Sequence, residues 1–114
     1  MNFEFATASR IVFGKGKSNQ IPKIWKQLGK KPMYIIGNSF KKYPSYDEIV
    51  TTHEKIVVTN EPSTHLIEEI SEKTKKSGCD VIISIGGGSV IDSGKAAAAL
   101  TPNSGSLLDY LEII

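Results

Sequence analysis

Hydrophobic residues along the chain gather in short runs that are separated by longer polar stretches. Four of these runs are rich in β-branched residues and are bounded by glycine, proline or asparagine, a pattern that predicts strands. They cover residues 10–13, 33–36, 55–59 and 80–85. The middle of the last run is apolar on both faces, which is typical of a buried strand in a parallel sheet.

Helical patterns occupy the polar stretches between these runs. Residues 19–31 place apolar side chains along one stripe at helical spacing. Residues 61–78 carry the most complete helix pattern: Ser63 or Thr64 can cap its start, and lysines gather near its end. The alanine-rich stretch 89–100 predicts a further, compact helix.

The last part of the chain is less regular. Residues 101–105 read as a turn, and we expect residues 106–114 to begin a helix or a helix-to-strand segment. Strands that alternate with helices imply βαβ units, so the predicted class is α/β: a Rossmann-like parallel sheet with helices on both faces. No internal repeat or linker divides the chain, which favours one domain over residues 1–114.

A glycine-rich stretch, SIGGGSVIDSGK at residues 84–95, follows the last strand run and opens the alanine-rich helix. At such a junction Gly86, Gly87 and Gly88 let an anion approach the backbone, and the helix start supplies free N–H groups. We therefore predict a phosphate or pyrophosphate site. Ser89 can add a hydroxyl donor or cap the helix. The alternative is that the glycines only make a tight turn, which needs one or two of them.

The known phosphate motifs do not fit this loop. A Walker A loop fails twice, because Lys95 is followed by Ala96 and the position five before Gly94 is Ser89. The usual dinucleotide fingerprint fails as well, since Ile91 stands where its third glycine belongs. The sequence thus predicts a phosphate loop of a different pattern.

Other chemically interesting residues are few. Asp92 and Lys95 can pair on the helix surface, or Asp92 can accept hydrogen bonds from a bound ligand; the spacing allows both. We interpret His53 and His65 as surface residues and not as metal ligands. Cys79 comes just before an apolar strand, where a structural thiol is expected.

The charge of the chain points to no particular class of macromolecular partner. Fourteen basic and twelve acidic residues give a net charge of +2, and they are scattered along the chain. This balance gives no reason to propose nucleic acid or a membrane as a partner. We expect a cytoplasmic protein, because the sequence shows neither a signal peptide nor a membrane span. A single cysteine leaves no intrachain disulfide to form.

Taken together, these stretches make the chain resemble the amino-terminal domain of the iron-containing (group III) alcohol dehydrogenase family. The signature GGGSVIDSGK is specific to this superfamily, and Ser89 favours its alcohol dehydrogenase branch because glycerol dehydrogenase-like members usually have lysine there. The supporting stretches are RIVFGKGK, YIIGNS, EPST, DVIISIGGGSVIDSGKA and GSLLDYLE.

The resemblance implies a binding site for NADP or NAD. It makes Gly86, Gly87, Gly88 and Ser89 the pyrophosphate loop and places Asp92 toward the nicotinamide. Many members have an aspartate where this chain has Asn38, and that aspartate excludes a 2′-phosphate. The amide predicts a preference shifted toward NADPH, unless it only shapes a turn.

The resemblance also implies what lies outside these 114 residues. Family members carry a second, all-helical domain that holds iron or zinc and the alcohol pocket. We therefore expect the complete enzyme to interconvert small alcohols and aldehydes or ketones, and this chain alone to be inactive. The alternatives are a non-catalytic nucleotide-binding fragment and a glycerol dehydrogenase-like member of the same superfamily. We further expect residues 106–114 to expose an apolar segment through which copies self-associate.

Overall fold

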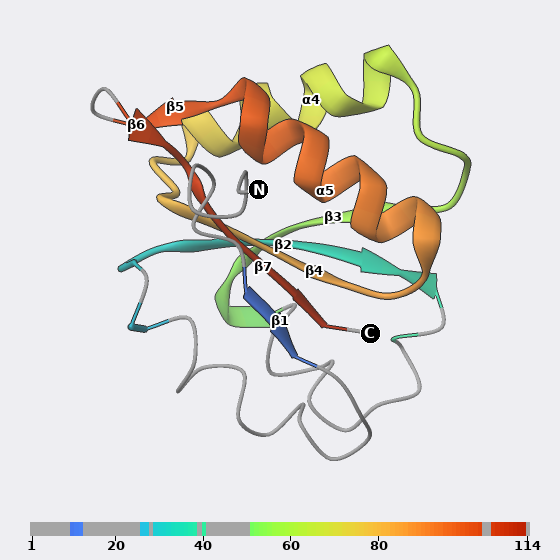
Figure 1. Ribbon diagram of the computed structural model, residues 1–114, viewed down its shortest axis with the longest axis horizontal. Helices are drawn as coiled ribbons and strands as arrows, with labels where there is room; N and C mark the ends of the chain where they lie inside the picture. Colours follow the sequence, from blue (N-terminus) through green and yellow to red (C-terminus); the bar gives the residue numbers. More distant parts are fainter. Residues whose placement is uncertain are drawn as a thin grey trace.

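A computed structural model of the chain describes residues 10–12, 26–27, 29–38, 40, 51–103 and 106–113. Five parallel strands form the main sheet in the order β1-β7-β4-β2-β3 (Figure 1). They are β1 (Arg10–Val12), β2 (Pro32–Gly37), β3 (Glu54–Val58), β4 (Val81–Ile85) and β7 (Asp109–Ile113). A short antiparallel ribbon pairs β5 (Pro102–Asn103) with β6 (Ser106–Leu107).

Two long helices follow strands of this sheet. Helix α4 (Thr64–Lys76) follows β3, and α5 (Gly88–Leu100) follows β4. Both lie over the same face of the sheet and pack against each other (Figure 1). The α/β parallel sheet is thus confirmed, with helices on this face. The third segment predicted to be helical, residues 19–31, lies largely outside the described residues.

The four predicted strands are confirmed to within one residue at either end. Their apolar pattern reflects real burial, since all five residues of β4 are buried between neighbouring strands and the helical layer. The predicted cap of α4 is confirmed too: the Ser63 hydroxyl accepts the Leu66 N–H at 3.1 Å. Local patterns were sufficient for these elements.

The end of the chain differs from the prediction. Residues 109–113 form β7, which lies between β1 and β4 inside the sheet, and no helix begins there. Leu108 is 2% exposed, while Tyr110 and Leu111 are 0% exposed. The expectation that this segment is exposed is therefore wrong for these three residues, because β7 lies inside the sheet. Self-association of copies stays a prediction.

Helix α5 is fixed closely over β4 and β7. A side chain at Gly94 would collide with the side chain of Ser84 and approach the ring of Tyr110 to 3.2 Å. The Tyr110 hydroxyl donates to the Ile91 carbonyl at 3.0 Å. These contacts hold the first turns of α5 in a defined place above the sheet. No helix in the described residues is long and apolar enough to cross a bilayer.

Candidate functional site

The glycine loop lies at the point of the sheet where the strand order reverses. From β2 the chain goes outward to β3, whereas from β4, on the other side of β2, it goes to β7. Ligands of open α/β sheets bind at such a switch point, beyond the carboxyl ends of the strands. Ile36 of β2 is in register with Ile85 of β4. Asn38 and the glycine loop therefore follow neighbouring strand ends.

The three glycines of the loop differ in whether the fold itself requires a glycine at that position. Gly86 has a φ of +153°, and a Cβ there would lie 2.9 Å from Val90 Cγ2. Gly37 meets the same methyl group at 3.1 Å, so Val90 packs over both strand ends. No atom of the described residues lies within 4 Å of a Cβ built on Gly87 or Gly88. A tight turn thus accounts for Gly86 only, and the other two leave room for an outside group.

The first turn of α5 has no cap of its own. Its N-cap residue, Gly87, cannot supply a side chain, and within the part of the chain that the structure describes no side-chain hydrogen bond caps the helix. No acidic residue lies in that first turn either. Free N–H groups and a partial positive charge at a helix start favour an anion. The geometry therefore leaves an anion-binding arrangement beside an open approach.

Ser89 lies on this first turn but does not cap it. Its hydroxyl donates to Glu61 Oε1 at 3.4 Å. The N-cap position belongs to Gly87, so the prediction that Ser89 caps the helix is wrong, whereas its role as a donor to a ligand stays a prediction. Glu61, in the connection between β3 and α4, was missed by the sequence reasoning. The contact joins residues 28 positions apart, and the sequence carries no local signal for it.

Asp92 and Lys95 do not form the surface ion pair that their spacing allows. Lys95 Nζ instead lies 3.5 Å from Glu112 Oε1 on β7, and the Glu112 side chain is 6% exposed. Asp92 is exposed one turn beyond the start of α5. Strand periodicity could have identified Glu112, because it places this residue on the same face of β7 as Tyr110. Burial raises the pKa of that tyrosine above its ordinary value.

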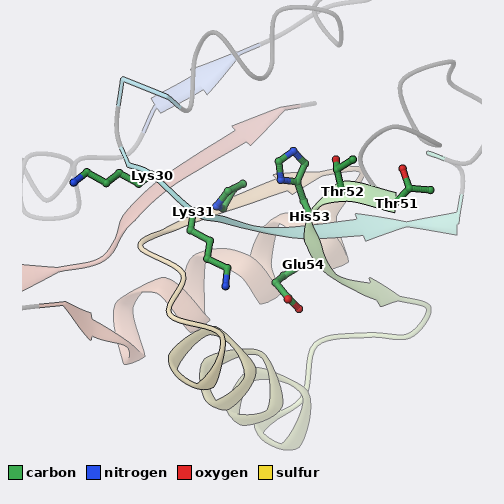
Figure 2. Close-up of a pocket in the computed structure, with 7 residues that line it drawn as sticks. Lys30, Lys31, Thr51, Thr52, His53 and Glu54 are labelled. Atoms are coloured by element: carbon green, nitrogen blue, oxygen red, sulfur yellow. The ribbon is translucent and has the colours of Figure 1, made fainter.

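A hollow of about 300 Å³ lies at the opposite edge of the sheet, at the amino ends of β2 and β3. Figure 2 shows that the side chains of Lys31 and Glu54 point away from that of His53. Lys31 Nζ already donates to the Ser77 carbonyl at 2.5 Å. The Asp80 carboxylate accepts the N–H groups of Lys30 and Lys31 at 2.9–3.0 Å. Polar groups at this edge thus hold the fold together.

The remaining candidates lie apart from the loop. The His53 ring is 5.5 Å from the ring of Tyr34, and His65 is exposed on α4. Among the described residues, no group of three or more histidine, cysteine or acidic side chains gathers to hold a metal ion. Cys79 is buried, and burial raises its pKa to about 11, as expected for a structural thiol.

Comparison with known proteins identifies the family. The sequence profile of the iron-containing alcohol dehydrogenases matches residues 8–113. The chain belongs to this family. It is 31% identical over 120 residues to the NADH-dependent butanol dehydrogenase B of Clostridium acetobutylicum, with 97% of this chain and 31% of that protein covered. It is 29% identical over 119 residues to a probable NADH-dependent butanol dehydrogenase 1 of Bacillus subtilis, which covers 96% of this chain and 31% of the relative.

Solved structures of the family show the same fold. The NADH-dependent butanol dehydrogenase A of Thermotoga maritima superposes with a TM-score of 0.72 at 28% identity, over 99% of this chain and 34% of that one. A probable glycerol dehydrogenase from Sinorhizobium meliloti reaches a TM-score of 0.72 at 19% identity, over 90% of this chain and 27% of that one. The chain spans about a third of the length of these family members.

Proposed function

We propose that this chain binds a nicotinamide dinucleotide with the pyrophosphate at the start of α5. The observation that carries the proposal is the uncapped helix start beside Gly87 and Gly88, whose surroundings are open. The switch-point position supports it, because the carboxyl ends of β2 and β4 are neighbours there and ligands of open α/β sheets bind beyond such ends. The backbone of Gly86, Gly87 and Gly88 and the hydroxyl of Ser89 would contact the phosphates.

The other two predicted site residues extend this proposal along the ligand. Asn38 follows β2 directly and is exposed, so it can meet the adenosine ribose. Asp92 is exposed on the next turn of α5, toward the end where we expect the nicotinamide. The amide of Asn38 brings no charge that repels a 2′-phosphate, so we propose a preference shifted toward NADPH. Three of the proteins compared above are named NADH-dependent, which makes this preference a point to test.

We further propose that the chain serves an alcohol dehydrogenase that moves a hydride between nicotinamide and a small alcohol or aldehyde. A bound iron or zinc ion in such an enzyme polarises the substrate oxygen. Within the described residues, no group of three or more histidine, cysteine or acidic side chains comes together to bind a metal ion. We therefore propose that other residues of a complete enzyme hold the metal. This chain contributes the binding and orientation of the dinucleotide. A cytoplasmic location stays a prediction.

A non-catalytic nucleotide-binding fragment would use the same loop and differ only in the reaction. An absorbance assay at the nicotinamide band, with added iron or zinc and a panel of small alcohols, separates the two. We expect no turnover by this chain alone. Metal-dependent turnover that is lost in Gly87→Val would show that these 114 residues suffice.

Titration calorimetry with NAD⁺ and NADP⁺ tests the binding site itself. Gly87→Val should lower the affinity about tenfold or more, because the branched side chain would fill the open approach. The matched control is Ala99→Val, which places the same valine side chain at an exposed position near the other end of α5. Equal binding by wild type and Gly87→Val would exclude the glycine loop as the site.

A further inference from the structure

The connection between β3 and α4 brings a carboxylate to the start of α5. Figure 1 shows this connection and the first turn of α5 at the same end of the sheet. Glu61 lies in the connection and is exposed. Its hydrogen bond with the Ser89 hydroxyl, 3.4 Å long, is the one that it makes within the described residues. Its charge thus lies beside the glycine loop, and no basic side chain of the described residues pairs with it.

We propose that the Glu61 carboxylate is an internal counter-anion for the start of α5, and that it competes with the phosphates of an incoming ligand. This inference rests on the proposed dinucleotide site. It assigns a role in ligand selection to a residue outside the glycine loop, contributed by a different element of the fold.

The charge balance at α5 supports this role. A negative group near a helix start is stabilising, yet the first turn of α5 has no acidic residue and no side-chain cap. Glu61 supplies the missing negative charge from another part of the chain. The same connection also ends in Ser63, which caps α4. The five residues 59–63 therefore contribute to two helix starts. Ser63 caps α4, which follows it directly in the chain, and Glu61 lies beside the start of α5, which is distant in sequence.

The hydrogen-bond balance leads to competition. The Ser89 hydroxyl has one proton, so it cannot donate to Glu61 and to a phosphate oxygen in the same geometry. When a pyrophosphate oxygen accepts the hydrogen bond from Ser89, the bond from Ser89 to Glu61 is broken. The negative charge of the pyrophosphate then lies close to the Glu61 carboxylate. The exposed carboxylate is screened by water, so the repulsion is modest and depends on salt.

Glu61 should therefore weaken the binding of small phosphorylated ligands. Inorganic pyrophosphate can interact with Glu61 only through its negative charge, so the carboxylate repels it fully. A dinucleotide has ribose hydroxyls as well, and these can donate to a nearby carboxylate. The result is discrimination in favour of the dinucleotide.

The test compares Glu61→Gln with wild type by titration calorimetry, using inorganic pyrophosphate and NAD⁺ at low salt. Glutamine keeps the size of the side chain and removes its charge. We expect pyrophosphate to bind about three- to tenfold more tightly to Glu61→Gln, and NAD⁺ to gain less. The gain should shrink in 0.5 M salt. Glu68→Gln is the matched control, since Glu68 is exposed on α4 and its change should leave both affinities as they were.

The outcomes distinguish this inference from the proposed function. If wild type binds both ligands and Glu61→Gln binds pyrophosphate equally or more weakly, Glu61 is no competitor and the dinucleotide site stands. If neither protein binds NAD⁺ or pyrophosphate, the dinucleotide site fails and the inference fails with it. An equal gain in pyrophosphate affinity in Glu68→Gln would show that the effect comes from the net charge of the protein and not from the position of Glu61. Glu61→Ala should repeat the gain of Glu61→Gln, which checks that the glutamine adds no contact of its own.

Discussion

Helices α4 and α5 each have thirteen residues and begin at the same edge of the sheet, but their ends are completed differently. At its start α4 has the Ser63 hydroxyl, and its last turn carries Lys73, Lys75 and Lys76. The α5 helix has no side-chain cap at Gly87 and no basic residue in its last turn. A helix that only supports the fold is thus closed by its own residues, whereas α5 leaves its first turn available.

Packing explains how α5 tolerates an open start. Capping contributes about 1 kcal/mol, whereas close packing of a whole helix face contributes several. Val90, Gly94, Ala97 and Ala98 are buried on α5. Small residues along this face let the helix lie close to β4 and β7, so its position does not depend on a cap. The difference between the two helices can be tested by four substitutions.

The largest effect is expected from Gly94→Val, which attacks the packing on which α5 depends. The new side chain would collide with Ser84 and crowd the ring of Tyr110. Overpacking of this kind costs about 2–3 kcal/mol. Urea unfolding should show a lower midpoint with an unchanged slope. Gly88→Ala is the control on the same helix: its surroundings are open, so it should unfold at the same or a higher urea concentration.

Closing the start of α5 is the second test. Gly87 has φ −87° and ψ −163°, an extended conformation that any residue adopts, and its surroundings are open. Gly87→Asp should cap the helix and stabilise the fold by about 0.5–1 kcal/mol. The same carboxylate should lower the affinity for NAD⁺ about tenfold or more, because it occupies the anion position. Thermal unfolding and calorimetry on one preparation measure both changes.

If Gly87→Asp stabilises the fold and leaves NAD⁺ affinity unchanged, the N-cap position of α5 is not where the ligand phosphate binds. Gly87→Asn serves as the control for charge. It can cap the helix as well as aspartate does, without the negative charge.

Opening the start of α4 is the converse test. Ser63→Ala removes the hydroxyl that accepts the Leu66 N–H and should destabilise the fold by about 1 kcal/mol. Binding of NAD⁺ should not change, since this helix start is not the proposed site. Urea unfolding measures the first quantity and calorimetry the second. Restored stability in Ser63→Asp would confirm that the cap is the cause, and a loss of NAD⁺ affinity in Ser63→Ala would contradict the assignment of separate roles.

The smallest effect concerns the choice of dinucleotide beside α5. Asn38→Asp should shift the ratio of NADP⁺ to NAD⁺ affinity about threefold or more toward NAD⁺, because a carboxylate repels the 2′-phosphate. Asn38→Ser is the uncharged control. Calorimetric affinities for both ligands give the ratio. Tighter binding of NAD⁺ than NADP⁺ by wild type would show that the amide does not set the preference.

Much of the fold could be predicted because its signals are local. The apolar run of β4 and the Ser63 cap each lie within a few residues of the structure that they specify. The end of the chain could not be assigned in this way, since Leu108, Tyr110 and Leu111 fit a helix as well as a strand until β1 and β4 pair with them.

The candidate site divides in the same manner. The glycine loop is contiguous, so it could be found from the sequence alone. The contact of Glu61 with Ser89 and the pair of Lys95 with Glu112 join residues that only the folded sheet brings together. Distinguishing Gly86 from Gly87 also needed the structure, because it depends on where Val90 packs.

The place of β7 in the sheet has a consequence for synthesis on the ribosome. Arg10 pairs in register with Leu111, so β1 acquires its partner only when the chain has been made as far as β7. Closing a loop of this length is entropically costly and slows the search for the native topology. Until β7 emerges, one edge of β4 lacks its neighbour and is available for wrong pairing. We expect this domain to complete its folding only after the last strand has left the exit tunnel.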